Sequence, residues 1–168
     1  MSKARDNATM SGKVVQTLNI RVDSRPTYTV SNTPTIMTEF NQIITPKYAS
    51  SKILVVWEVG YEAGYNAVFN IYRNGSILSN GYNTEIGNVH YSGYAAAAYD
   101  VDVASTPNRT NITFFDTPAT TAQLTYGLSF RSASASSQTI YINRTASSTG
   151  GTDYENQVSL GYVQEIAQ

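Results

Sequence analysis

The stretch Ser51–Tyr61, SKILVVWEVGY, decides the fold because its side chains follow a period of two. One face carries an entirely apolar set, Ile53, Val55, Trp57 and Val59. The other face carries Leu54, Val56 and Glu58. Successive side chains of a β-strand point to opposite faces of the sheet, so the pattern predicts a central strand that is buried on both sides for most of its length.

Strand and turn signals continue on the C-terminal side of this stretch. In VFNIYRNGSIL, Asn74 and Gly75 separate two short runs, and Asn-Gly tolerates the positive φ angles of a two-residue type I′ hairpin. Three later segments also alternate, LTYGLSF (124–130), TIYIN (139–143) and QVSLGYVQEI (157–166). Each has one face that suits a core and one that is less apolar. In the last segment the more apolar set is Val158, Leu160 and Tyr162.

The whole chain has the composition of a β-protein. Thr (20), Ser (18), Asn (14) and Tyr (13) are abundant, and only 14% of the 168 residues are charged. No window of about a dozen residues has the apolar spacing of an amphipathic helix, and strand candidates recur about every 8–12 residues between polar clusters. The sequence predicts an all-β antiparallel sandwich, a jelly roll of about 8–10 strands, over residues 14–168.

Residues 1–13 differ from the rest because they are polar and have no periodicity. They form either a frayed terminus or an arm that orders on a partner, with Lys3, Arg5 and Lys13 as the candidate contacts. They contain no apolar signal-peptide core.

Charge and composition also limit the classes of partner. The net charge of −1 lacks the basic footprint of a nucleic-acid-binding protein. The chain has no cysteine, so it has neither a disulfide framework nor a thiolate metal site. No apolar run approaches the ~20 residues of a spanning helix. We therefore expect no nucleic-acid partner and no membrane insertion.

Candidate catalytic residues are few. His90 is the only histidine, and a Ser-His-Asp triad built on it would have no local signature, so that hypothesis is rejected. Asp116 stands out between two alternating runs in ITFFDTPATTAQLTYGLSF. An Asp two residues before Pro118 is typical of a turn, where its side chain accepts a backbone N–H two residues on. We predict that Asp116 is a turn residue and not an acid catalyst.

The other acids suggest a cation site only weakly. In YDVDV, Asp100 and Asp102 share one side of a strand about 7 Å apart, which suits a cation or simply a solvated face. Asp153 and Glu155 lie in GGTDYEN, which is a candidate calcium loop or a polar turn. In both cases the simpler interpretation is preferred. No metal, cofactor or catalytic residue is predicted.

Tyrosine is concentrated in the middle third beside Gly and Asn. Such a mixture makes contact surfaces for proteins and stacking platforms for sugars, or it simply lines sheet faces and subunit contacts. The candidates for glycan or subunit contact are Tyr61, Tyr65, Tyr82, Tyr91, Tyr94 and Tyr99. The alanines at 95–98 would allow close approach of a second subunit.

Several segments in order, MSKARD, GKVVQT, ITPKYASSKILV, IYRNGS, FFDTPATTAQLTY, IYINR and VSLGYVQEI, resemble short structural proteins and fibre-tip domains of bacteriophages, notably marine and cyanobacterial phages. The resemblance covers nearly the whole chain. It implies an antiparallel jelly roll similar to the C1q/TNF kind, a homotrimer, display on the virion surface after assembly in the host cytoplasm, and no catalytic residues.

Two functions follow as hypotheses. The first is a non-enzymatic virion structural protein, a trimeric knob attached to the capsid, as decoration or head fibre, or to a fibre base. The second is a tail-fibre receptor-binding tip that recognises host-surface glycan. A carbohydrate hydrolase is a distant third, for which Asp100, Asp102, Asp116, Asp153 and Glu155 would be the acids.

Overall fold

The computed structural model of this chain describes residues 12–78, 94–95, 104–148 and 155–168. These residues form β-strands and no α-helix, as predicted. The strands are β1 (Val14–Val22), β2 (Thr27–Val30), β3 (Thr35–Ile44), β4 (Lys52–Ala63), β5 (Ala67–Arg73), β6 (Ser76–Ile77), β7 (Tyr94–Ala95), β8 (Asn108–Asp116), β9 (Leu124–Ser132), β10 (Gln138–Ile142) and β11 (Ser159–Ile166).

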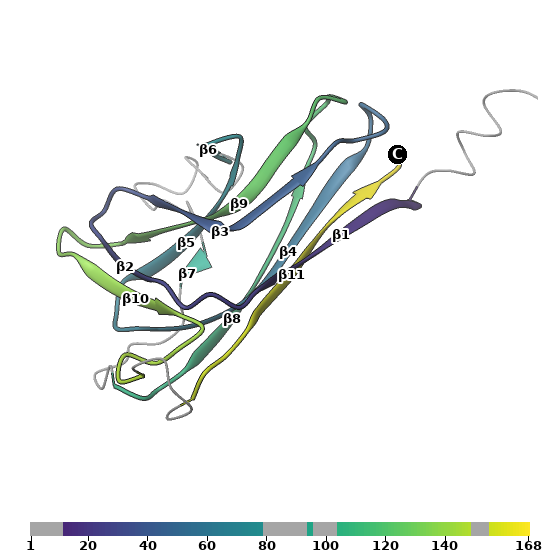
Figure 1. Cartoon of the computed structure of the whole chain (residues 1–168). Coiled ribbons are helices and arrows are strands. Elements are labelled where there is room, and N and C mark those ends of the chain that lie inside the picture. The colour runs from purple at the N-terminus through teal and green to yellow at the C-terminus, as the bar shows by residue number, and fades with distance from the viewer. Residues whose placement is uncertain (1–11, 79–93, 96–103, 149–154) are drawn as a thin grey trace, which may run out of the picture.

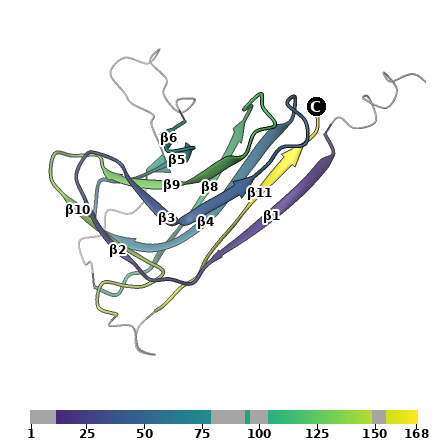
Figure 2. The ribbon, with the colours of Figure 1, turned by 45° about the horizontal axis from the view of Figure 1, so that its top comes forward.

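The strands form two antiparallel sheets that face each other (Figures 1 and 2). Sheet A has the order β1-β11-β4-β10-β2, and β8 pairs with the opposite edge of β4. Sheet B has the order β3-β9-β5-β6, and β7 also pairs with β5. The pairs β1·β11, β3·β9, β4·β8 and β5·β7 are nested in sequence and alternate between the sheets. This nesting is jelly-roll connectivity, so the predicted fold class is confirmed.

The opening stretch lies in β4, at the centre of sheet A. Its purely apolar face is fully buried: Ile53, Val55, Trp57 and Val59 are each 0% exposed. Trp57 packs edge-to-face on Phe40 of β3 with ring centroids 5.7 Å apart, and Tyr61 packs in the same way on Phe69 of β5 at 5.3 Å. These aromatic pairs join the two sheets and fill the core between them.

The predicted hairpin is also confirmed. Asn74 and Gly75 have φ angles of 52° and 81°, which is the left-handed conformation that a type I′ turn requires at both positions. They connect β5 to β6, with Arg73 opposite Ser76. The Asn74 side chain accepts a hydrogen bond from Thr125 N at 2.8 Å, so the turn is also attached to the start of β9.

The predictions about which faces are buried were wrong in two places. In β4, Leu54, Val56 and Glu58 are only half-buried, although the strand was expected to be buried on both sides for most of its length. In β11, the more apolar set faces outward: Leu160 is 43% exposed, whereas Ser159 and Val163 are fully buried.

The reason is Gly161, which lies opposite Trp57 in the register. A Cβ at position 161 would come within 2.3 Å of the Trp57 ring and 2.6 Å of the Val56 carbonyl oxygen. The indole therefore requires a glycine on the inner face of β11. Because side chains alternate along a strand, that requirement turns Leu160 and Tyr162 outward.

One end of the sandwich is closed by the buried side chain of Asn143, just after β10. Its Nδ2 donates to the carbonyl oxygens of Val22 at 2.6 Å and Ser24 at 3.0 Å, and its Oδ1 accepts from Ser159 Oγ at 2.7 Å. Ser159 Oγ in turn accepts from Gly60 N at 2.9 Å. These bonds join β1, β4, β10 and β11 through the fully buried side chains of Asn143 and Ser159.

Candidate interaction surfaces

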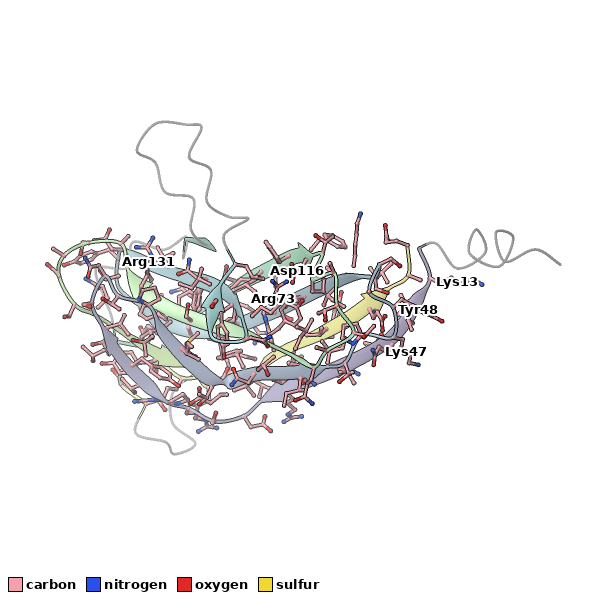
Figure 3. All side chains as sticks on the ribbon, turned by 90° about the horizontal axis from the view of Figure 1, so that it is seen from above. Lys13, Lys47, Tyr48, Arg73, Asp116 and Arg131 are labelled. Atoms are coloured by element: carbon pink, nitrogen blue, oxygen red, sulfur yellow. The ribbon has the colours of Figure 1, made fainter. Side chains whose placement is uncertain are left out.

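Asp116, the candidate acid of the sequence, is the last residue of β8 and is 3% exposed. Its Oδ2 accepts hydrogen bonds from Arg73 Nη1 and from Tyr126 OH, both at 2.5 Å. Figure 3 labels Asp116 and Arg73, which lie close together. The predicted bond to a backbone N–H two residues on was wrong, because that residue is Pro118, which has no backbone N–H. Asp116 thus connects sheet A to β5 and β9 of sheet B, which is a structural role.

The phenol of Tyr126 takes part in the same cluster. Burial raises its pKa, the Asp116 carboxylate raises it further, and Arg73 opposes the shift. The phenol therefore stays protonated as a hydrogen-bond donor to Asp116. A carboxylate that is buried and bonded in this way presents no free acid to a substrate.

Asp116→Ala is expected to lower the free energy of unfolding by about 2–3 kcal/mol, because it leaves Arg73 and the buried Tyr126 hydroxyl without their acceptor. Asp116→Asn keeps one acceptor oxygen, so its loss should be about half as large. Urea denaturation measures both. Glu58→Ala is the control, because it breaks the exposed Glu58–Arg109 pair at a cost of about 0.5 kcal/mol or less. Equal losses for Asp116→Ala and Glu58→Ala would contradict the structural role.

The structure separates the tyrosines that were predicted to act together. Tyr61 is 2% exposed and lies in the core against Phe69, so the prediction that it lines a contact surface is wrong. Tyr65 is 47% exposed, between β4 and β5. Tyr94 begins β7, and its backbone pairs with that of Phe69. The remaining candidates lie outside the described residues: Tyr82, Tyr91 and Tyr99.

The other predicted residues are divided in the same way. Lys13 is exposed and Glu155 is exposed, whereas the rest lie outside the described part of the chain: Lys3, Arg5, His90, Asp100, Asp102 and Asp153. Among the residues that the structure describes, no group of three or more His, Cys, Asp or Glu is placed to hold a metal ion. The same residues include no helix long and apolar enough to cross a membrane.

Sheet A carries an apolar outer surface that the sequence did not predict. We call it the β4–β11 face and define it as Leu54, Val56, Phe115, Leu160, Tyr162 and Ile166. In the register, Phe115 lies beside Leu54, and Tyr162 lies beside Val56. Phe115 is 56% exposed and Leu160 is 43% exposed. The surface extends to β8, which pairs only with β4 among the described strands.

A second surface lies at the end of the sandwich where β1 begins and β11 ends. We call it the lysine end and define it as Lys13, Lys47, Tyr48 and Lys52, all of which are exposed. Lys52 pairs with Ile166, and Ile166 pairs with Val14, next to Lys13. Figure 3 shows Lys13, Lys47 and Tyr48 together at this end of the molecule. Of these residues, sequence reasoning had identified only Lys13.

The buried carboxylate of Glu165 holds the loop of the lysine end in place. Its Oε1 accepts from Lys47 N at 2.8 Å, Tyr48 N at 3.0 Å and Ser51 Oγ at 2.8 Å, and its Oε2 accepts from Gln16 Nε2 at 2.7 Å. Burial alone would raise the pKa of Glu165, but these hydrogen bonds outweigh it and hold the pKa below its usual value. The anion therefore fixes the backbone of Lys47 and Tyr48.

Comparisons with known proteins give a limited result. No protein-family model matches the chain, and no curated protein matches its sequence. Three similar solved structures come from infectious bursal disease virus. The Gx strain structure is 12% identical with a TM-score of 0.38, the VP2 subviral particle 10% with 0.39, and the Gt strain structure 12% with 0.40. They cover 92–94% of this chain, which spans 39–42% of the length of theirs.

Proposed function

We propose that this chain is a non-enzymatic structural protein of a virus particle, a surface knob made of three copies and attached to the capsid or to a fibre base. The proposal is supported by the resemblance of the sequence to phage structural proteins together with the jelly-roll connectivity. A non-enzymatic role also agrees with the position of Asp116, because its carboxylate accepts hydrogen bonds from other side chains inside the protein. Cryo-electron microscopy of intact particles tests the proposal, which expects density of this shape on the outer surface.

The observation that carries the proposed assembly is the β4–β11 face. Both long central strands of sheet A place apolar side chains on the outside, although polar side chains are normal on the solvent face of an antiparallel sheet. A cluster of outward-facing apolar side chains, here with Gln164 among them opposite Leu54, is typical of a protein–protein contact.

The chemistry of the face suits a second copy of the same chain. Glu58 is neutralised by Arg109 Nη1 at 2.7 Å, and Arg21, opposite Leu160, is neutralised by Asp23. Lys52, opposite Ile166, forms no ion pair among the described residues, so like-charge repulsion between identical faces would be confined to that end of the face. The face also reaches the edge strand β8, where Phe115 can contact a neighbouring subunit.

We expect the protein to behave as a trimer in light scattering after size exclusion, and Phe115→Glu or Leu160→Glu to convert it to monomers. Both residues are exposed in the isolated chain and should tolerate the change, whereas an unpaired carboxylate buried in a contact costs about 3–5 kcal/mol. Ile43→Glu is the matched control, because Ile43 is 51% exposed on the outer face of sheet B. A monomeric wild type, or dissociation caused by Ile43→Glu alone, would contradict this assembly.

A further inference from the structure

The lysines of this chain lie in one part of the sequence, and the fold brings the described ones to one end of the molecule. All four precede Ile53 in the sequence, and the three that the structure describes are the exposed lysines of the lysine end. No carboxylate among the described residues forms an ion pair with them. In contrast, Arg21, Arg73 and Arg109 are each paired with an acid.

The acids next to the lysine end do not neutralise it. Glu165 and Asp116 both lie opposite Ile53 in the register, one on each side of β4. Glu165 is 0% exposed and is held by four hydrogen bonds, and Asp116 is 3% exposed and paired with Arg73. Among the described side chains, the charge that this end presents to solvent is therefore positive, although the whole chain has a net charge of −1.

The lysines are also presented on a fixed backbone. Glu165 holds Lys47 and Tyr48, Ala167 N donates to the Lys13 carbonyl at 2.9 Å, and Lys52 lies in the central strand. Two exposed apolar groups lie among the charges, Tyr48 at 43% and Val14 at 54%. Because the backbone is held, ordering of the loop adds little to the entropy cost of binding, and Tyr48 is of a residue type that is enriched in protein contacts.

We propose that the lysine end docks this protein onto an acidic protein surface, namely a carboxylate-rich patch of the particle that carries it. The inference rests on the proposed function and adds the site of attachment and the chemistry of the partner. Charge complementarity indicates a partner with an acidic surface. The exposed apolar groups of Tyr48 and Val14 favour a folded protein as that partner, because a protein that binds nucleic acid usually has a larger cationic area.

The test is sedimentation of the full-length protein with particles of the virus that encodes it, prepared without this chain. The triple variant Lys13→Glu, Lys47→Glu and Lys52→Glu is expected to weaken binding at least about tenfold, and added salt should weaken the binding of the wild type. Arg25→Glu is the matched control, because Arg25 is exposed and lies after β1, at the far end of that strand. It should bind as the wild type does.

A second arm of the same experiment identifies the partner. Particles whose carboxylates have been amidated with carbodiimide and glycine ethyl ester should lose binding, and nuclease-treated particles should keep it. Loss of binding only after nuclease treatment would overturn the acidic-protein partner in favour of nucleic acid.

Glu165→Gln tests whether binding depends on the positions of the lysines or only on their total charge. This variant makes the protein more positive but replaces the acceptor that holds Lys47 and Tyr48, so binding should fall if their positions matter. It is compared with the wild type at a temperature where near-ultraviolet circular dichroism shows both to be folded. Tighter binding by Glu165→Gln would contradict a positioned surface.

The outcomes for the two proposals differ. If the wild type and the triple variant bind particles equally well, the lysine end is not the docking site, while the role in the particle survives. If the wild type does not bind the particles at all, the proposed function fails, and the docking proposal fails with it.

Discussion

Asn143→Ala is expected to lower the free energy of unfolding by about 3–5 kcal/mol. The change removes three hydrogen bonds at once, two of them buried, and takes a donor from the carbonyl oxygens of Val22 and Ser24. It also places alanine at a φ of 56°, a left-handed conformation that Asn tolerates better than other non-glycine residues. Guanidinium denaturation followed by tryptophan fluorescence measures the loss, since Trp57 is the only tryptophan.

Asn143→Gly separates the loss of the hydrogen bonds from the unfavourable backbone conformation of alanine. Glycine removes the same hydrogen bonds but has no steric penalty at positive φ, so it should be less destabilising than alanine by about 1 kcal/mol. The difference between the two variants measures the conformational part. A stability within 1 kcal/mol of wild type for both variants would show that water replaces the amide, contrary to the burial of Asn143 at 0% exposed.

The second large effect is expected for Glu165→Ala, with a loss of about 3 kcal/mol or more. Without the carboxylate, the N–H groups of Lys47 and Tyr48 and the Ser51 hydroxyl lose their acceptor. The loop between β3 and β4 can recover part of the cost only by moving toward water. Urea denaturation measures the loss, and hydrogen exchange at Lys47 and Tyr48 should become faster.

Glu165 should also make stability depend on pH. Its pKa is lower in the folded protein than the ordinary glutamate value of about 4.3, so its contribution is complete above that pH and is lost as the pH falls through the lower, folded-state pKa. Between pH 5 and the acid transition, the wild type should therefore lose more stability than Glu165→Gln. Parallel curves for wild type and Glu165→Gln would contradict the low pKa.

The fold was predictable from local patterns because side chains of a β-strand alternate between two faces, and this alternation is visible in the sequence. The alternation in β4 and β9 and the Asn74-Gly75 turn were confirmed, since each depends on the backbone geometry of a few adjacent residues. Asp116 was predicted to be a turn residue, and the structure places it at the end of β8 with its carboxylate in an internal cluster. Its partners could not be predicted, because Arg73 and Tyr126 are remote from it in sequence or on another strand.

The candidate surfaces were largely missed. The lysine end had one signal in the sequence, the restriction of every lysine to the first 52 residues, but which of them meet depends on strand pairing between residues 14 and 166. The tyrosines of the middle third seemed a natural contact surface, and Tyr61 instead fills the core. An aromatic ring suits both environments, so composition does not distinguish them.

Taken alone, the sequence determined that this chain is a β-sandwich, where its tight turn and most of its longer strands lie, and which residues of those strands share a face. The strands β2 and β3 were not predicted. Only the tertiary structure decided which face of β11 is buried and which acids are neutralised. The alternation of side chains along a strand shows which residues share a face, but it does not show whether that face is buried or exposed. Here the Trp57 ring occupies the space that a side chain at position 161 would need, so Gly161 must face inward and the apolar side chains of Leu160 and Tyr162 face out.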